Sequence, residues 1–564
     1  MSLDKLFSSF SIGTLETKNR IVMPPMATHY ASPQGFVTDR QIAYYVERAR
    51  GGVGYITVEH TGILQQGKAS PKMLLISSDK HASKIENLIE AVHRVGGKIV
   101  VQINHAGRQT SSTVTGSPIV GPSPISCPTR NEIPRELSVG EIEEITEAFS
   151  MAAQRVKNTG ADGVELHMAH GYLICSFLSS FSNRRIDRYG GDIEGRTRFA
   201  RDLLNAVRNR VGPDFPIICR LSGDEYVDGG LKIEETKQIA QILEKEGADA
   251  LHVSACNAAS GYLTQPPYYV EEGVFVHLAE AIKSVVNIPV ITVGRIRNPV
   301  MADQIVRDGK ADLVSMGRAL IADPHLPKKA EEGRFEEIIP CISCNRCIQT
   351  QRKEAIRCAV NPETGNEDRF KFSKSDRPRK VWVVGGGPAG LKAAEIAALR
   401  GHEVTVFERG HKLGGRMRLA AIPPKKAVLN DFLDYLERRV RELGVILEMG
   451  KEFTVEMVGE IALDLVTHLK HYLSHRLAEK GVTIHTSTKV KELGKGYALV
   501  EDASGTRKIE GFDTIVLAVG SKSDDRIAKD LEGKVPELYV IGDASEPREA
   551  LQAVYEEEEI AIKI

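Results

Sequence analysis

Short apolar runs rich in β-branched residues recur along the chain up to Met316 and are separated by stretches of amphipathic helical period. Apolar strands that alternate with such helices are typical of parallel βαβ units. Eight units predict a closed (β/α)8 TIM barrel, because the rival arrangement, a doubly wound sheet, seldom needs eight. The predicted strands are Ile21–Met23, Tyr55–Val58, Lys98–Ile103, Gly163–His167, Pro216–Leu221, Ala250–Ser254, Pro289–Val293 and Asp312–Met316.

A second pattern begins at Lys380, where an apolar strand leads into a tight glycine turn and then into a helix. Gly385, Gly387 and Gly390 give the spacing G-x-G-x-x-G, and Glu408 closes the next strand, Glu403–Glu408. A glycine turn between strand and helix, followed by an acid at the end of the second strand, is typical of a dinucleotide-binding fold. The sequence therefore predicts a Rossmann-like domain after the barrel.

Polar groups follow the predicted barrel strands, at the end where (β/α)8 enzymes place their active sites. The pairs Gly294–Arg295 and Gly317–Arg318 come after strands seven and eight. Glycine N–H groups and an arginine fork at these two positions usually hold a phosphate. We therefore expect a phosphate-bearing cofactor. The other polar strand ends are Glu59–His60, Gln102–Asn104–His105, His167–His170–Tyr172, Arg220 and His252–Ser254.

Four of the eight cysteines lie between the two folds, at the spacing C-x2-C-x2-C-x10-C. Such thiolates can converge on one soft inorganic centre. Structural zinc is the alternative, but zinc usually takes two C-x-x-C pairs. Three cysteines in one tight loop and a fourth further along favour a 4Fe-4S cluster. The predicted ligands are Cys341, Cys344, Cys347 and Cys358.

Charge and hydropathy restrict the class of partner. The 74 Lys and Arg residues balance the 75 Asp and Glu residues, so no net field favours nucleic acid or an anionic membrane. The chain starts without the basic and apolar segments of a signal peptide, and no apolar run approaches the ~20 residues that span a bilayer. We expect a cytoplasmic protein without nucleic-acid or membrane partners.

Several motifs in order resemble the FMN barrel of the Old Yellow Enzyme superfamily: Asn19–Met26, Gln102–Arg108, His167–Leu173, Asn183–Gly191 and Met316–Ala319. The cysteine segment and the glycine turn extend the likeness to the iron–sulfur flavoproteins of that superfamily, namely 2,4-dienoyl-CoA reductase, 2-enoate reductase and trimethylamine dehydrogenase. The resemblance implies three parts. They are an FMN barrel at 1–335, a cluster segment at 336–378, and an FAD-binding domain at 379–564 with an incomplete NAD(P)-type insert at about 455–520.

The resemblance also implies roles for the barrel residues. Gln102 would bind the pyrimidine edge of FMN, and Arg220 would place a positive charge beside the reduced flavin. The remaining FMN contacts would come from the backbone of Pro24, Pro25 and Met26 and, at the phosphate, from Gly294, Arg295, Gly317 and Arg318.

For catalysis, the resemblance implies that His167 and His170 donate hydrogen bonds to the carbonyl oxygen of an α,β-unsaturated substrate. Flavin N5 would deliver hydride to the β-carbon, and Tyr172 would protonate the α-carbon. Dienoyl-CoA reductases often use a histidine elsewhere, and His252 is one alternative for it. His29 and Tyr30 would shape the pocket.

In the C-terminal part, the resemblance implies FAD binding by two further motifs besides the glycine turn, the first with Gly415 and Arg416 and the second with Asp543. The FAD-binding residues would then be Gly385, Gly387, Ala389, Gly390, Glu408, Gly415, Arg416 and Asp543. Related reductases carry a second glycine fingerprint for NAD(P)H. We find only a remnant around Glu456, so either the insert is naturally short or residues are missing.

The leading hypothesis is an ene-reductase with a small unsaturated carbonyl substrate. Electrons would pass from NAD(P)H or a partner protein to FAD, to the cluster and to FMN. An amine dehydrogenase or demethylase of the trimethylamine dehydrogenase type is the alternative, although that type tends to have tyrosine where His167 stands. A non-catalytic electron-transfer subunit is a third hypothesis, disfavoured by the intact H-x-x-H-G-Y motif. We expect a homo-oligomer.

Overall fold

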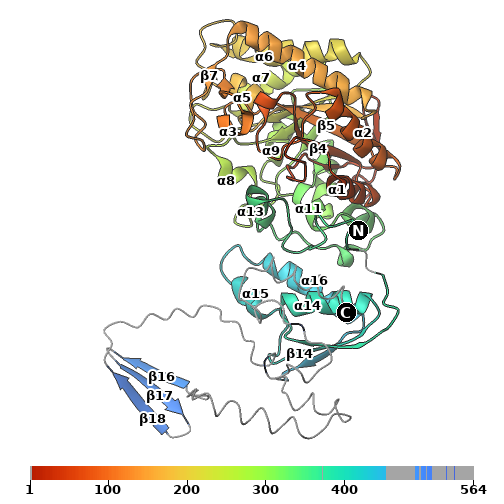
Figure 1. Ribbon diagram of the computed structural model, residues 1–564, viewed down its shortest axis with the longest axis vertical. Helices are drawn as coiled ribbons and strands as arrows, with labels where there is room; N and C mark the ends of the chain where they lie inside the picture. The colour runs from red at the N-terminus through yellow and green to blue at the C-terminus, as the bar shows by residue number, and fades with distance from the viewer. Residues whose placement is uncertain are drawn as a thin grey trace. The chain divides into compact units, whose positions relative to one another are not determined.

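The computed structural model describes residues 3–370, 373–451, 489–494, 497–502, 505–510, 529 and 539. The described residues up to Gly450 belong to one compact unit (Figure 1). A second unit lies within Lys451–Arg548. Among the described residues, no helix has the length and apolar character needed to cross a bilayer.

The predicted (β/α)8 barrel is confirmed. Eight parallel strands close on themselves in the order β10-β11-β12-β3-β4-β5-β8-β9. All eight apolar runs supply a strand of the barrel. The strands are β3 Ile21–Met23, β4 Tyr55–Gly62, β5 Ile99–Asn104, β8 Gly163–Met168, β9 Ile217–Ser222, β10 Ala250–Ser254, β11 Val290–Thr292 and β12 Leu313–Ser315.

The barrel interior is layered from apolar to polar. Strand residues including Val100, Ile218 and Ala250 form one buried cluster with Ile12 and Leu15 of the hairpin β1 (Phe10–Ile12) and β2 (Leu15–Thr17). Alternate strand residues share a face, so the inward position after the apolar layer lies two residues further along each strand. Those next positions include Gln102, Arg220, His252 and Ser315. The polar layer therefore lies toward the carboxyl ends of the strands.

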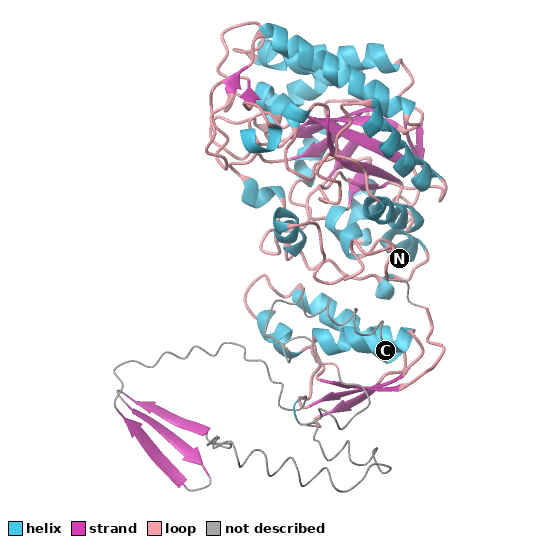
Figure 2. Ribbon diagram, in the orientation of Figure 1, coloured by secondary structure: helices cyan, strands magenta, loops and turns pink. Residues whose placement is uncertain are grey.

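Helices cover the barrel strands on the outside (Figure 2). Their ends carry ordinary caps: Ser138 and Glu141 form a capping box at the start of α4, and Asp192 accepts from Gly195 at the start of α6. The helices are α1 Asp39–Arg50, α2 Asp79–His93, α3 Ser112–Thr115, α4 Val139–Asn158, α5 Leu173–Leu178, α6 Ile193–Val211, α7 Ile233–Lys245, α8 Gly261–Thr264, α9 Val276–Lys283, α10 Pro299–Arg307, α11 Gly317–Ala322 and α12 Leu326–Glu331. Smaller elements are η1 Gln65–Gly67, β6 Val120–Gly121 and β7 Arg135–Glu136.

The cysteine segment holds η2 (Phe335–Glu337) and α13 (Arg346–Lys353) and is fastened to the loop after β3. The hydroxyl of Tyr30 donates to the carbonyl of Ile356 over 2.7 Å, and the N–H of Ile356 donates to the carbonyl of Thr28 over 2.9 Å. A buried ion pair between Arg48 and Glu367, 2.8 Å long, adds a second attachment. Cys358 thus lies two residues from a point anchored on the barrel.

The predicted Rossmann-like fold is confirmed for the described part. Three parallel strands pair in the order β13-β14-β15, with the glycine turn between β13 and α14. The strands are β13 Lys380–Val384, β14 Glu403–Glu408 and β15 Ile446–Met449, and the helices are α14 Pro388–Leu399, α15 Gly415–Ala420 and α16 Leu429–Glu442. The boundaries at 335 and 378 stay predictions.

The region of the predicted incomplete insert contributes an antiparallel sheet to the second unit, in the order β16-β17-β18. Its strands are β16 Lys489–Gly494, β17 Tyr497–Asp502 and β18 Gly505–Glu510. The sequence pattern did not predict this sheet. Glu456, at the proposed remnant of the nucleotide turn, lies outside the described residues, as does Asp543.

Candidate active site

Strand register brings the polar groups of neighbouring strands together. His167 on β8 lies opposite Arg220 on β9, and Arg220 lies opposite His252 on β10. Because all strands are parallel, the groups that follow β4, β8 and β10 emerge at one end of the barrel. The structure therefore collects at one barrel mouth side chains that are far apart in the sequence.

Four rings cluster at this mouth. The ring of His167 lies 5.2 Å from that of His170 and 4.8 Å from that of Tyr172, centroid to centroid. The ring of His60 lies 5.5 Å from Tyr172 and 6.4 Å from His167. His60, His167, His170 and Tyr172 are called the ring cluster below. The sequence motif predicted three of its members and missed His60, whose only signal was its place at the end of the second barrel strand.

The proton positions in the histidine pair follow from their backbone and hydroxyl partners. The N–H of Ala169 donates to Nδ1 of His167 over 3.3 Å, which leaves the ring proton on Nε2. Nε2 of His170 lies 2.8 Å from Oγ of Ser254. His170 also has a left-handed backbone with φ of 63°, and its N–H donates to Oγ of Ser222 over 2.9 Å. This turn brings the ring of His170 next to the ring of His167 at the barrel mouth.

Burial sets the charge of the ring cluster. It lowers the pKa of both His167 and His170 well below 6.5, with further lowering by nearby Arg220. Burial also raises the pKa of Tyr172 to about 12. At neutral pH the imidazoles are thus uncharged donors and the phenol keeps its proton.

A buried polar network lies in the same barrel layer. Nε2 of Gln102 donates to Glu165 over 2.7 Å, and the other oxygen of Glu165 lies 2.9 Å from Nδ1 of His252. Nε2 of His252 lies 3.1 Å from Oγ of Ser315. Both ring nitrogens of His252 are therefore engaged by the protein, and His252 makes no ring contact with the ring cluster among the described residues. His252 therefore belongs to a network with Glu165 and Ser315 and not to the ring cluster.

Several buried polar atoms at this end of the barrel lack a partner within the described part of the chain, as expected where a polar ligand belongs. Nε of Arg220 is one, and its side chain is buried. An unsatisfied buried donor or acceptor costs roughly 1–3 kcal/mol. The others are Oγ1 of Thr57, Oδ1 of Asn104 and Nε2 of His105. These donors and acceptors fit the polar edge of a flavin.

Side chains of the loop after β3 pack closely on the backbone after β12. A Cβ added to Gly317 would lie 2.8 Å from Sδ of Met26 and 3.0 Å from Cγ of Pro24. Pro25 lies in the same loop. The segment predicted to line the flavin ring and the segment predicted to bind its phosphate are therefore in contact.

Both predicted phosphate arginines also touch the cysteine loop. Nε of Arg295 donates to Oγ of Ser343 over 3.2 Å, and Nη1 of Arg318 donates to Oδ1 of Asn345 over 2.5 Å. Ser343 and Asn345 both have left-handed backbones, with φ of 50° and 57°. Gly294, which precedes Arg295, has φ of 135°. The loop that carries three cysteines is therefore shaped around these arginines.

The four clustered cysteines line one cavity with Arg318, Ile321 and Val360, and all four are free thiols. Burial raises the pKa of Cys347 to about 12 and that of Cys358 well above its usual value. Within the described ranges, no three His, Cys, Asp or Glu side chains are placed to hold a single metal ion. The four cysteines predicted as ligands thus face one shared cavity.

The glycine turn has the open backbone that a pyrophosphate needs. Gly385 has φ of 106°, and a Cβ on Gly385 or Gly387 would meet nothing within 4 Å. A Cβ on Gly390 would lie 2.0 Å from the carbonyl oxygen of Gly385, so only glycine lets α14 approach β13. The turn ends at Gly387, the N-cap of α14. Ala389 lies in the first turn of this helix.

Two further predicted residues adjoin this turn. Glu408 accepts hydrogen bonds from the N–H groups of Gly386 and Gly410, over 2.8 and 2.7 Å. A Cβ on Gly415 would lie 3.4 Å from Cα of Gly387. Exposed Arg416 follows in α15. The structure thus brings both described glycine motifs of the predicted FAD site side by side.

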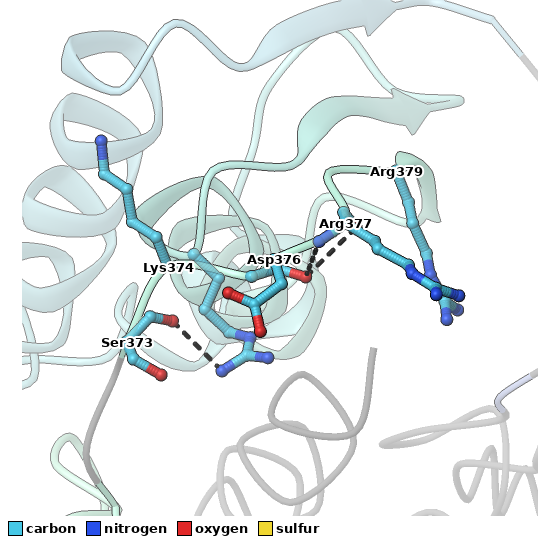
Figure 3. A pocket seen from close by; sticks show the side chains of 7 residues that line it. Ser373, Lys374, Asp376, Arg377 and Arg379 are labelled. Carbon is cyan, nitrogen blue, oxygen red and sulfur yellow. Dashed lines mark hydrogen bonds between the residues drawn. The ribbon is translucent and has the colours of Figure 1, made fainter.

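A basic pocket that the sequence did not predict lies at the start of the Rossmann-like part (Figure 3). The guanidinium of Arg400 donates to the carbonyl of Ser373 over 3.3 Å. None of the predicted site residues lines this pocket. Its lining residues are Ser373, Lys374, Ser375, Asp376, Arg377, Arg379 and Arg400.

Comparisons with known families match both halves of the chain. The NADH:flavin oxidoreductase / NADH oxidase family matches residues 5–337. An NAD(P)-binding Rossmann-like domain matches residues 383–431. The first match covers the barrel, and the second covers the glycine turn with α14 and β14.

Individual proteins are similar over most of the chain. An NADH oxidase of Thermoanaerobacter brockii is 47% identical, over 82% of this chain and 72% of that protein. A cinnamate reductase of Clostridium sporogenes is 33% identical, over 91% and 79%. The solved structure of a 2-naphthoyl-CoA reductase in complex with 2-naphthoyl-CoA is 27% identical, with a TM-score of 0.87 over 100% of both chains.

Proposed function

Because the chain belongs to the NADH:flavin oxidoreductase / NADH oxidase family, we propose that this oxidoreductase reduces the C=C bond of an α,β-unsaturated carbonyl compound. The observation that carries the proposal is the ring cluster, in which two uncharged imidazoles and a protonated phenol meet at the barrel mouth. The similarity to a cinnamate reductase and to a 2-naphthoyl-CoA reductase supports this type of substrate.

The histidine pair polarises the substrate carbonyl. His167 donates through Nε2, since Nδ1 already accepts from Ala169. His170 donates through Nδ1 when the hydroxyl of Ser254 donates to its Nε2. Two donors on one oxygen withdraw electrons from the conjugated system and make the β-carbon electrophilic. Uncharged imidazoles suit this role because they donate without giving up the proton.

Tyr172 supplies the proton. Its pKa of about 12 keeps the phenol protonated at neutral pH, and its ring lies 4.8 Å from that of His167. A phenol beside the carbonyl donors can protonate the α-carbon as charge develops there. Transfer from Tyr172 completes the addition of H2 across the double bond, together with one hydride.

The cofactors that fit are FMN in the barrel, FAD at the Gly385–Gly390 turn and a 4Fe-4S cluster on Cys341, Cys344, Cys347 and Cys358. When bound, FMN supplies the hydride, while FAD and the cluster supply one-electron transfer from NAD(P)H or a partner protein. Arg220 offers a positive charge to the reduced flavin, and Gln102 offers its amide oxygen to the pyrimidine edge. Arg295 and Arg318 would hold the FMN phosphate, and their hydrogen bonds to Ser343 and Asn345 join them to the loop whose cysteines would hold the cluster together with Cys358.

The test is an anaerobic half-reaction. The holoenzyme is reduced with dithionite, freed of excess reductant and mixed with cinnamate, cinnamaldehyde or an enoyl thioester, and flavin reoxidation is followed by absorbance. Saturable reoxidation with formation of the saturated product supports the proposal. Reduction of the oxidised holoenzyme by a secondary or tertiary methylamine, with no reoxidation by any unsaturated carbonyl, would instead establish an amine dehydrogenase.

A further inference from the structure

His60 is the third imidazole of the ring cluster, and the proposed function gives it no role. It lies near the end of β4, with its ring 5.5 Å from Tyr172 and 6.4 Å from His167. Its side chain is partly exposed, so it is accessible at the barrel mouth. A polar ring at this distance from the proton donor and one carbonyl donor lies within reach of the same small substrate.

Asn104 fixes the tautomer of His60. The amide nitrogen of Asn104 lies 3.2 Å from Nδ1 of His60. An amide nitrogen can only donate, so Nδ1 accepts and the ring proton sits on Nε2. Burial, with His29 and Arg220 nearby, lowers the pKa of His60 to about 4, so the ring is neutral at pH 7. His60 is therefore prepared as an Nε2–H donor in the same way as His167.

The donor atom of His60 is available. Among the residues that the structure describes, Nε2 of His60 has no hydrogen-bond partner, whereas Nε2 of His170 is engaged by Ser254 and both nitrogens of His252 are engaged by Glu165 and Ser315. A donor that the protein orients but does not use is expected to bind a ligand.

The number of hydrogen-bond acceptors on the substrate indicates its chemical class. A ketone or aldehyde carbonyl has two lone pairs, which His167 and His170 can satisfy. A carboxylate has a second oxygen that also needs donors, and a thioester sulfur is a poor acceptor. Positive charge near the ring cluster favours an anionic substrate. Arg220 is buried beside these rings, and exposed Arg130 lies close enough to lower the pKa of Tyr172.

We propose that His60 is a specificity-determining donor that binds the second oxygen of an α,β-unsaturated carboxylate, with Asn104 as its positioning residue. This inference rests on the proposed function and narrows its substrate class to enoates. A site built to hydrogen-bond a substrate group discriminates strongly against analogues that lack the group, because its own polar atoms are then left unpaired.

The experiment compares one acid with its aldehyde. The dithionite-reduced holoenzyme is mixed with cinnamate or cinnamaldehyde, and the second-order rate constant of flavin reoxidation is measured for wild type and for His60→Phe, His60→Gln and Asn104→Leu. His60→Phe keeps a ring but loses the donor, and His60→Gln keeps an N–H. His277→Ala, on the exposed face of α9, is the matched control for loss of a histidine.

We expect His60→Phe to lower the ratio of the cinnamate to the cinnamaldehyde rate constant about 10-fold or more, the effect of losing a hydrogen bond to a charged group. His60→Gln should restore part of that ratio, and Asn104→Leu should lower it. His277→Ala should leave it unchanged. In parallel, 3-phenylpropanoate should perturb the oxidised flavin spectrum of wild type at lower concentration than of His60→Phe.

Two results overturn the inference while leaving the proposed function intact: reduction of cinnamaldehyde but not cinnamate by wild type, or equal losses on both substrates in His60→Phe. Reduction of no unsaturated carbonyl by wild type overturns the proposed function and the inference with it.

Discussion

Nη1 of Arg318 donates a hydrogen bond to Oδ1 of Asn345 over 2.5 Å. Arg318 follows the last barrel strand, and Asn345 stands in the cysteine loop between Cys344 and Cys347. The parallel bond from Arg295 to Ser343 joins the preceding strand end to the same loop. The predicted phosphate site and the predicted cluster site are thus joined by hydrogen bonds, and Arg318 lines the cysteine cavity as well. A substitution at one site should therefore alter cofactor binding at the other.

Loss of the Asn345 amide should therefore weaken cofactor retention. We expect Asn345→Gly to lose FMN several-fold faster on dialysis than wild type, because Arg318 loses an acceptor that orients it, a bond to a charged group worth roughly 1.5–3 kcal/mol. FMN and iron per chain are measured after dialysis. Asn345→Asp is the control, since it keeps the acceptor oxygen, whereas glycine keeps only the left-handed backbone. Equal retention by both variants would contradict the prediction.

The cysteine assignment predicts metal content. Anaerobically purified protein should hold about four irons per chain, as a cubane requires. Cys344→Ala should lose most of this iron and stop electron passage between the flavins, while dithionite-reduced FMN still reduces substrate. Cys219→Ala is the control, because Cys219 is a buried free thiol on β9 outside the cysteine cavity. One zinc per chain without iron would exclude the cluster.

Removal of either carbonyl donor should slow the oxidative half-reaction. We expect His167→Ala and His170→Ala each to reduce the rate by roughly 10²-fold or more, the usual effect of losing one preorganised donor. Tyr172→Phe should keep substrate affinity and slow the proton-transfer step. Stopped-flow reoxidation of reduced flavin measures all three. Full rates in both histidine variants would disprove the carbonyl role.

The sequence carries one G-x-G-x-x-G fingerprint, at Gly385–Gly390, which predicts weak nicotinamide binding. FAD should occupy Gly385–Gly390, so NADH or NADPH should bleach the FAD slowly or not at all, and reduction should need a partner protein. Gly387→Val should fold, since a Cβ there meets nothing within 4 Å, but should lose FAD. Fast, saturable bleaching of wild-type FAD at micromolar NADH would contradict the prediction.

Two neutral histidines near the barrel mouth predict acid sensitivity. Burial lowers the folded-state pKa of His60 and of His105 to about 4, below the ordinary 6.5. The unfolded state then binds more protons between these values, so both residues contribute full stability above about pH 6.5 and lose it as pH falls toward 4. We expect Tm to fall over this range, and to fall less in His105→Gln. If the Tm of His105→Gln depends on pH in the same way as that of the wild type, protonation of His105 does not contribute to the acid sensitivity.

The sequence alone determined the two folds and three members of the ring cluster. Alternating apolar runs predicted all eight barrel strands, because period and burial are local properties of a strand. The Gly385–Gly390 turn and its acid were equally evident, since a positive φ and a close helix approach require glycine at fixed spacing. The H-x-x-H-G-Y motif supplied three of the four rings for the same reason, as neighbours on one strand end.

Only the tertiary structure decided which distant side chains meet. His60 joins His167 because β4 and β8 both end at one barrel mouth, and no local pattern distinguishes His60 from a solvent-facing loop histidine. The bond from Arg318 to Asn345 depends on how the cysteine loop folds back on the barrel. Likewise, His252 proved to be engaged by Glu165 and Ser315, because strand register, which a sequence does not display, brings three strands together around it.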